Sequence, residues 1–445
     1  MQGAEAHAGL RYASGAFSQG VPCASDIPLV LVTLPSKPMP VHATMGQFPV
    51  VNGELCVGGM ALTRLAARIG RTPFYAYDRA AIDRRIATLR AALPASVRLH
   101  YALKANPMPA LVAHVVRRVD GIDVASAGEL AIALDGGVDP NHVSFAGPAK
   151  TEAELAQALA AGILINVESF REVAVLSALA RETGWRPRVA VRVNPDFELR
   201  SSGMKMGGGP KQFGIDAERV PDVLAAIAGA GLAFEGFHLF AGSQNLDPAA
   251  ITEAQTRSYE LALRLSREAP APVRHLNLGG GFGIPYFPGE HHLELEPIGR
   301  NLQRIVDDAR RDLPGAEIVV ELGRYIVGEA GIYVCRVVER KLSRDQVFLI
   351  TDGGLHHHLA ASGNFGQVVR KNYPVAIGTR MGTARTECAS VVGPLCTPLD
   401  LLGDRMDLAR AEPGDLVVVF QSGAYGASAS PGRFLGHPAV IEALV

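Results

Sequence analysis

The chain has 445 residues, of which 48% are hydrophobic and 20% charged, which is ordinary for a globular protein with a large core. Lys and Arg number 43 against 44 Asp and Glu, so the net charge of −1 argues against a nucleic-acid-binding protein that relies on a general basic field. No apolar run approaches the roughly 18 residues that a membrane span requires.

The N-terminal residues 1–45 are rich in Gly, Ala, Ser and Pro and lack the pattern of a secretory signal, so we expect a disordered extension. The five cysteines of the chain are scattered, and no Cys-x-x-Cys pair occurs. This usage argues against a disulfide framework or a cysteine zinc site and predicts a reducing, cytoplasmic location.

Eight β-rich runs alternate with Ala- and Leu-rich helical stretches through the middle of the chain. This alternation is typical of parallel βαβ units, and eight strands predict a (β/α)8 barrel, with an open doubly wound sheet as the alternative. The predicted strands are Val97–Leu103, Gly121–Val124, His142–Phe145, Ile163–Val167, Arg188–Val193, Phe234–Phe240, Val273–Leu278 and Glu317–Glu321. The predicted helices lie near 107–119, 127–136, 151–161, 169–183, 217–230, 248–268 and 296–312.

After about residue 325 the pattern changes to strands with few helices between them, which predicts a separate β-domain. Its expected strands are Ile332–Val338, Val347–Thr351, Glu387–Val392 and Leu416–Phe420. The earlier segment Thr72–Tyr77 also has strand character and is predicted to pair with that domain. We therefore expect residues 46–85 to contribute to the β-domain, residues 86–325 to form the barrel, and residues 326–445 to form the C-terminal β-domain.

Lys104 follows the first predicted barrel strand, in which apolar and polar side chains alternate. A lysine in such an apolar setting is costly unless its charge is used, paired or suppressed, and its amine could form a Schiff base at the barrel mouth. The alternative is a lysine whose ammonium group reaches the solvent at the rim.

Three further motifs carry possible chemistry, and each has a structural alternative. The turn Gly279–Gly283 would let backbone N–H groups approach a phosphate, or it is a bare turn. Glu321 and Arg324 would hold a ring nitrogen and a phosphate, or they pair with each other. Cys396 lies between two prolines in a predicted loop and is either a proton donor or inert.

Two further segments contain residue types that can bind a metal ion or an anion. His356, His357 and His358 are adjacent and project in different directions, and no His-Glu-x-x-His occurs, so we predict no metal site and keep a metal-dependent hydrolase only as a rival. Met204–Gly214 is too Gly-rich for a regular element and is predicted to be a mobile loop with two lysines available for an anion.

Taken together, seven motifs occur in the order found in the fold-type III pyridoxal-phosphate decarboxylases, which include the diaminopimelate, ornithine and arginine decarboxylases. The resemblance runs from about residue 70 to the C-terminus and implies an alanine-racemase-like barrel plus a β-domain. The motifs are Tyr-Ala-Leu-Lys104-Ala-Asn, Asp123-Val-Ala-Ser, Gly242-Ser243-Gln, Gly279–Gly283, Glu321-Leu-Gly-Arg324, Gly393-Pro-Leu-Cys396 and Gly423-Ala-Tyr425.

The resemblance implies roles for these residues around pyridoxal 5'-phosphate. Lys104 would form the Schiff base, Glu321 would pair with the pyridine nitrogen, and Cys396 would protonate Cα across a homodimer interface. Phe240 stands where the family has a ring-stacking histidine, and Asp400 is placed to support the Cys396 loop. The cofactor-binding set implied is Lys104, Asp123, Phe240, Ser243, Gly280, Gly281, Glu321, Arg324 and Tyr425.

Departures from the family pattern concern the substrate. Thr397 follows Cys396 where the family has an acid, and a hydroxyl cannot neutralise a distal ammonium. Asp352 begins a stretch that replaces the family's usual sequence, so Thr397, Asp400 and Asp352 are predicted to face the substrate. These changes resemble the branch that acts on carrier-protein-linked aminoacyl groups and the exosortase-associated decarboxylases.

The implied reaction is decarboxylation of a free L-amino acid or a carrier-linked aminoacyl group, with the active site at the interface of a homodimer. The alternatives are a diaminopimelate decarboxylase proper, an amino-acid racemase on the same fold, and a catalytically silent regulatory homologue. Glu321 favours decarboxylation over racemisation, because racemases of this fold often place an arginine against the ring nitrogen.

Overall fold

The computed structural model describes residues 41–198, 204, 205 and 207–445. Residues 1–40 of the predicted extension and Met206 of the predicted loop lie outside this part of the chain. Within the described part, no helix is long and apolar enough to cross a membrane.

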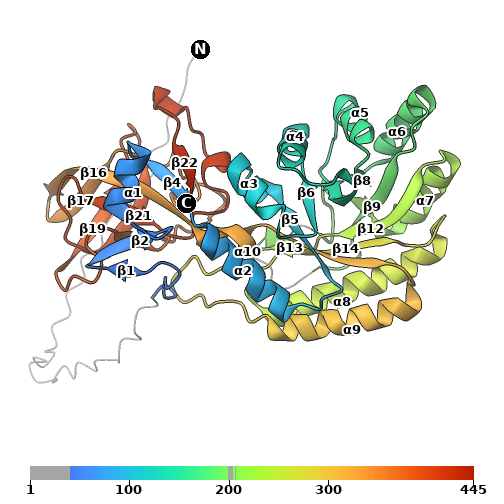
Figure 1. Cartoon of the computed structure of the whole chain (residues 1–445), viewed down its shortest axis with the longest axis horizontal. Helices are drawn as coiled ribbons and strands as arrows, with labels where there is room; N and C mark the ends of the chain where they lie inside the picture. Colours follow the sequence, from blue (N-terminus) through green and yellow to red (C-terminus); the bar gives the residue numbers. More distant parts are fainter. Residues whose placement is uncertain (1–40, 199–203, 206) are drawn as a thin grey trace, which may run out of the picture. The chain divides into compact units, whose positions relative to one another are not determined.

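Eight parallel strands close into a barrel, as the sequence predicts (Figure 1). β15 pairs with β5 and β8 pairs with β9, so the ring has no free edge and the open-sheet alternative is wrong. The strands are β5 (Arg98–Ala102), β6 (Gly121–Val124), β7 (Val143–Phe145), β8 (Leu164–Val167), β9 (Arg188–Asn194), β12 (Ala233–Leu239), β14 (His275–Gly280) and β15 (Glu317–Leu322).

Helices cover the outside of the barrel (Figure 1). Several begin at side-chain caps, such as Ser126, Ser169 and the capping box of Thr151 with Glu154, which fix where each helix starts. The helices are α2 (Arg79–Ala92), α3 (Pro109–Val115), α4 (Ala127–Asp135), α5 (Glu152–Ala161), α6 (Phe170–Thr183), α7 (Val220–Gly229), α8 (Pro248–Leu265) and α9 (Glu296–Asp312).

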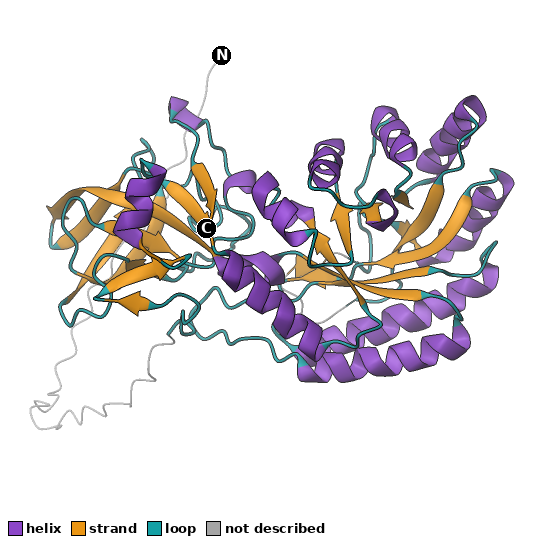
Figure 2. Cartoon of the chain, viewed as in Figure 1, coloured by secondary structure: helices purple, strands orange, loops and turns teal. Residues whose placement is uncertain are grey.

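The β-domain is built from distant parts of the chain, which confirms the predicted N-terminal strand. β4 (Phe74–Tyr77) pairs antiparallel with β16 (Gly331–Ser343) and parallel with β22 (Ile441–Leu444). Strands dominate this region in Figure 2. The other strands of its sheet are β17 (Gln346–Thr351), β18 (Val375–Ile377), β19 (Thr386–Val392), β20 (Leu401–Ala409) and β21 (Leu416–Val419).

Several short elements were not predicted. β1 (Val50–Val51), β2 (Glu54–Val57) and β3 (Met60–Ala61) form a small sheet, followed by α1 (Leu62–Ile69). Side chains from these elements, such as Leu55 and Leu62, pack against Phe74 and Val418 in a second hydrophobic cluster. The N-terminal segment is therefore joined to the β-domain by burial as well as by strand pairing.

The predicted loop 204–214 is partly regular, which corrects the expectation of a wholly irregular segment. β10 (Met204–Lys205) pairs antiparallel with β13 (Gly242–Ser243), and β11 (Ile215–Asp216) extends the barrel sheet beside β9. The pairing partner of β10 comes from a loop after β12, so the local glycine content could not indicate this strand.

Candidate active site

A cavity of about 200 Å³ lies at the carboxyl ends of the barrel strands, where barrel enzymes place their chemistry. Tyr425 and Phe365, which line it, come from the chain after the barrel. Glu321 is the only acidic residue among the side chains that line it. The full lining is Ala102, Lys104, Phe240, Ser243, Gly281, Phe282, Glu321, Leu322, Gly323, Arg324, Phe365 and Tyr425.

Lys104 sits in η1 (Leu103–Ala105), a single 3-10 turn that directly follows β5. Its side chain is 41% exposed, and Nζ lies 4.0 Å from Oε1 of Glu321. The same nitrogen lies 5.3 Å from the ring centre of Phe240. The amine is therefore held over the cavity between a carboxylate and an aromatic face, and solvent reaches it.

Glu321 on β15 is held by side chains from two neighbouring strands. His238 Nε2 donates to Oε2 at 3.0 Å, and Asn277 Nδ2 approaches the same oxygen at 3.5 Å. Burial would raise the pKa of the Glu321 carboxyl, but the hydrogen bond and charge of His238, together with Lys104, hold that pKa well below its usual range. The group is therefore a fixed carboxylate at the mouth of the barrel.

The glycine turn after β14 allows the backbone of two strands to approach closely. A Cβ on Gly281 would lie 2.1 Å from the carbonyl oxygen of Gly242, and the residue has a φ of +75°. A Cβ on Gly280 would lie 2.0 Å from the carbonyl oxygen of Glu321. Only glycine fits at these positions, and without side chains a ligand can approach the backbone closely.

Arg324 is a half-buried cation with no carboxylate partner in the described part of the chain. Its Nη1 donates to the Tyr286 hydroxyl at 2.8 Å, and the guanidinium lies 4.6 Å from the ring centre of Tyr425. Its buried Nε has no hydrogen-bond partner among the described residues. A guanidinium in this setting is suited to bind an anion such as a phosphate.

Asp123 lies inside the barrel and does not line the cavity. His100 Nδ1 donates to its Oδ1 at 3.1 Å, and the Ser144 hydroxyl donates to the same oxygen. Burial by itself would lower the pKa of His100, but the charge and hydrogen bond of Asp123 raise the pKa of His100 above its usual value. The pair therefore belongs to the polar interior below the cavity.

The other predicted residues of the β-domain do not reach the cavity of their own chain. Cys396 is an exposed free thiol, and Thr397 is half-buried beside it. Asp400 accepts from the backbone N–H of Leu355 at 2.6 Å and of Leu395 at 2.8 Å. It thus holds the loop that carries Cys396.

Asp352 also has its oxygens engaged within the β-domain. It accepts from the backbone N–H of Arg336 at 2.8 Å and from the hydroxyl of Thr72. The three adjacent histidines are buried nearby, and two of them have different partners: His357 Nε2 reaches Pro438 O and His358 Nε2 reaches Ser422 Oγ, both at 2.9 Å. The ring nitrogens of His356 have no hydrogen-bond partner among the described residues. Over the described residues, no three His, Cys, Asp or Glu side chains are grouped to hold a metal ion.

Comparisons with known proteins agree with this geometry. Residues 79–328 match the family model for the pyridoxal-binding domain of pyridoxal-dependent decarboxylases. The chain belongs to that family. This decarboxylase is 39% identical to the L-glutamyl-[BtrI acyl-carrier protein] decarboxylase of Niallia circulans over 86% of the chain and 90% of that relative.

The decarboxylase is also 32% identical to the diaminopimelate decarboxylase of Aquifex aeolicus, over 88% of the chain and 91% of that relative. Among solved structures, the diaminopimelate decarboxylase of Helicobacter pylori complexed with L-lysine superposes with a TM-score of 0.76 at 26% identity, covering 86% of this chain and 94% of that one. The family and fold predicted from the sequence are therefore confirmed.

Family membership makes this chain a carboxy-lyase that uses pyridoxal 5'-phosphate. The cavity fits that cofactor, since it combines an accessible lysine amine, a fixed carboxylate and a half-buried arginine without a carboxylate partner among the described residues. Sequence reasoning did not identify Asn277 or the link from His238 to Glu321. Both residues alternate with apolar neighbours on strands, which is the one signal that they point inward.

Proposed function

We propose that Lys104 binds the aldehyde carbon of pyridoxal phosphate, that Glu321 lies against its pyridine nitrogen and that Phe240 faces its ring. The phosphate would be held by Ser243, Gly280, Gly281, Arg324 and Tyr425. Asp123 would contribute to the cofactor site from the barrel interior. The bound cofactor supplies an electron sink for the pair left when CO2 departs. The observation that carries this assignment is the single cavity that six of these side chains and Gly281 share.

We further propose that the substrate is an aminoacyl group on a carrier protein, with L-glutamyl as the first candidate. Among the described residues of one chain, no carboxylate other than Glu321 lines the cavity. Asp352, which would face the substrate from the partner, already accepts hydrogen bonds from Arg336 N–H and the Thr72 hydroxyl. The site therefore offers no free carboxylate to neutralise a distal ammonium of a free diamino acid. The name of the Niallia circulans relative supports the same substrate class. Because CO2 leaves from the α-carboxylate, a glutamyl group must be tethered through its side-chain carboxyl.

Cys396 is proposed to deliver a proton to Cα in the cavity of a second copy of the chain. It is exposed and does not line the cavity of its own chain, so a role in the reaction requires a partner. Exposed apolar side chains occur in the same region of the sequence, including Phe365, Val368, Val369 and Leu399, which supports a homodimer. The described cysteines are all free thiols, in keeping with a cytoplasmic location.

In the proposed reaction the bond between Cα and the carboxylate breaks, the electron pair stays with Cα, and one proton replaces CO2. Thr397, beside Cys396, and Asp352 would face the substrate from the partner's loops, and Asp400 would hold the Cys396 loop in position. A diaminopimelate decarboxylase proper is the second candidate, favoured by the Aquifex aeolicus and Helicobacter pylori relatives.

The experiment is to supply holoenzyme with L-glutamyl thioester on a carrier protein, free L-glutamate and meso-diaminopimelate, and to measure CO2 release. We expect turnover of the thioester and at least about 100-fold lower kcat/KM for the two free acids. Faster turnover of diaminopimelate would replace the carrier-linked substrate with the second candidate. No CO2 from any of them, with cofactor bound, would contradict the proposed substrate class.

Shared active sites can be tested by mixing two inactive variants. Lys104→Ala and Cys396→Ala are co-refolded or co-expressed, so that half of the dimers carry one of each. If Cys396 acts across the interface, one complete site forms in each mixed dimer and about a quarter of the wild-type activity returns. If Cys396 acts within its own chain, no activity returns, and Cys388→Ala is the matched control for loss of an exposed thiol.

A further inference from the structure

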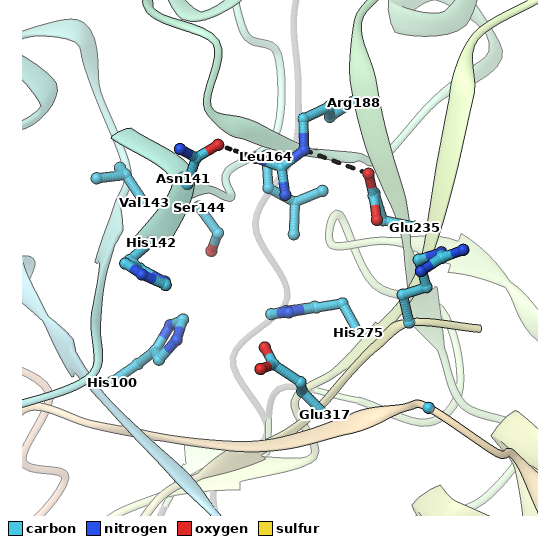
Figure 3. A pocket seen from close by; sticks show the side chains of 12 residues that line it. His100, Asn141, His142, Val143, Ser144, Leu164, Arg188, Glu235, His275 and Glu317 are labelled. Carbon is cyan, nitrogen blue, oxygen red and sulfur yellow. Dashed lines mark hydrogen bonds and ion pairs between the residues drawn. The ribbon is translucent and has the colours of Figure 1, made fainter. Parts of the chain in front are cut away.

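A second cavity, of about 270 Å³, lies at the amino ends of the barrel strands, opposite the proposed active site (Figure 3). Its lining comes from the first one to three residues of seven barrel strands and from nearby loops. Figure 3 shows the rings of His100, His142 and His275 directed into one space, with Glu317 and Glu235 at its sides. None of these residues has a role in the reaction proposed above.

The two carboxylates of this cavity already have arginine partners. Arg188 Nε lies 3.2 Å from Glu235, and Arg98 Nη2 lies 2.9 Å from Glu317. Arg274 also lines the cavity, and within the described ranges it makes no ion pair. Arg98 lies outside the lining, which itself holds two arginines and two glutamates. Because Arg98 pairs with Glu317 from outside, Arg274 is the lining cation without a carboxylate partner among the described residues, and it favours a ligand of negative charge.

His275 supplies a polar atom that lacks a partner. Its Nε2 is buried and has no hydrogen bond to any described residue. Burial and the charges of His100 and His238 lower the pKa of His275 to about 3, so the ring is neutral at physiological pH. A buried imidazole nitrogen normally has a partner, and leaving it without one is unfavourable.

The backbone fixes Arg274 and His275 at this end of the barrel. Arg274 N donates to Glu235 O, and Arg274 O accepts from Glu317 N, both at 2.8 Å. His275 is the first residue of β14 and is paired with Gly236 and Glu317 on the two neighbouring strands. The two side chains are therefore presented by a rigid element, which is what a preformed binding site requires.

We propose that this amino-end cavity is a second binding site, for a small anion with carboxylate or phosphate oxygens. Arg274 would pair with the anion, and Nε2–H of His275 would donate to one of its oxygens. The volume suits an ion of the size of phosphate or a short dicarboxylate. The site is separate from the cofactor cavity, and the proposal does not depend on the identity of the substrate.

The test uses holoenzyme saturated with pyridoxal phosphate, so that the cofactor's own phosphate site is filled. Inorganic phosphate and malonate are titrated separately, up to about 50 mM, while calorimetry and NMR of the histidine ring nitrogens are recorded. The His275 resonance is assigned as the one lost in His275→Gln. We expect saturable binding of one or both anions with a Kd of about 1 mM or below and a shift of that resonance.

Arg274→Gln should weaken this binding at least about tenfold, since it removes the one unmatched cation. Arg267→Gln is the matched control, because Arg267 is also exposed and does not line the cavity, and it should leave binding unchanged. Saturation by phosphate alone or by malonate alone supports the site and selects the ligand class. Absence of saturable binding, an unmoved His275 resonance, or unchanged affinity in Arg274→Gln would overturn the proposal.

Discussion

The two ends of the barrel both hold cavities lined by charged side chains, but those charges are paired differently. At the carboxyl end, Lys104 lies 4.0 Å from a carboxylate that His238 already holds at 3.0 Å, and Arg324 has no acidic partner among the described residues. At the amino end, Glu235 and Glu317 are each matched to an arginine. The carboxyl end therefore has a reactive amine, Lys104, and a cation, Arg324, that can bind a phosphate. The amino end has a cation, Arg274, that can bind an anion, but it has no nucleophile.

One strand connects these two environments. β14 carries His275 at the amino-end cavity, Asn277 beside Glu321, and Gly280 at the turn next to the proposed active site. Side chains at every second position point to the same face, so His275 and Asn277 both enter the barrel interior. The two ends therefore differ in charge pairing because the neighbouring strands place different side chains beside the carboxylates. This difference does not depend on the geometry of the strand.

The largest effect should follow from removing the amine at the carboxyl end. Lys104→Ala should lower CO2 release by at least about 1000-fold and abolish covalent retention of the cofactor after borohydride reduction. Peptide mass mapping of the reduced wild type should place the adduct on Lys104. Lys341→Ala, an exposed lysine on β16, is the control. Wild-type turnover in Lys104→Ala would remove this residue from the reaction.

The support of Glu321 can be tested through His238. His238→Leu removes the hydrogen bond to the carboxylate, and a bond to a charged group is worth about 1.5–3 kcal/mol, so kcat should fall about 10- to 100-fold. His238→Gln keeps an N–H donor and should recover much of the loss. The absorption spectrum of the bound cofactor is the second readout. Equal defects in both variants would indicate that His238 acts by packing alone.

Two glycine variants test whether the close approach of Gly281 to the neighbouring backbone is needed for cofactor binding at the carboxyl end of the barrel. Gly281→Ala would place Cβ 2.1 Å from a carbonyl oxygen at a φ of +75°, and should weaken cofactor affinity about tenfold or more. Gly315→Ala has a similar φ of +86° but meets no atom within 4 Å, and it lines the other cavity. It should lower stability slightly and leave cofactor affinity unchanged. Equal affinities in the two variants would argue against a phosphate cradle at Gly281.

The smallest effect concerns acid stability and the amino end. In the unfolded chain a histidine titrates near about 6.5, but folded His275 has a pKa of about 3, so the unfolded state binds more protons between these values. Stability is thus lost as pH falls below about 6.5. His275→Gln should reduce this loss by up to about 1.4 kcal/mol per pH unit, measured by urea unfolding in sulfonate buffers.

Acid sensitivity should be greater in the β-domain than in the barrel. Burial holds the pKa of His356 and of His358 at about 3, and both lie in the β-domain. Burial also lowers the pKa of His357 in the β-domain and of His292 in the barrel. Three imidazoles of the β-domain therefore take up protons on unfolding, against two in the barrel, His275 and His292. If hydrogen exchange between about pH 7 and 5.5 accelerates first in the barrel, the assignment of acid sensitivity to the imidazoles of the β-domain is wrong.

Regular segments were readable from the sequence because their signals are local. The predicted strand Gly121–Val124 and the helix 296–312 have the same limits in the structure, since a glycine opens the strand and a proline lies in the first turn of the helix. β20 (Leu401–Ala409) was missed because Gly403, Asp404 and Arg405 interrupt its alternation. Its stability comes from pairing with β19, which no local window reveals.

The sequence by itself determined the alternating βα pattern, the strand that opens the β-domain, and, through ordered motifs, the family and its cofactor. Only the tertiary structure decided which charges meet: His238 and Asn277 on Glu321, Asp400 under the Cys396 loop, and Arg274 left without a carboxylate in the described part of the chain. The physical reason is the different distance along the chain over which these interactions act. Backbone preference and hydrophobic period act over a few residues, whereas electrostatic pairing joins side chains from strands that are far apart in the sequence.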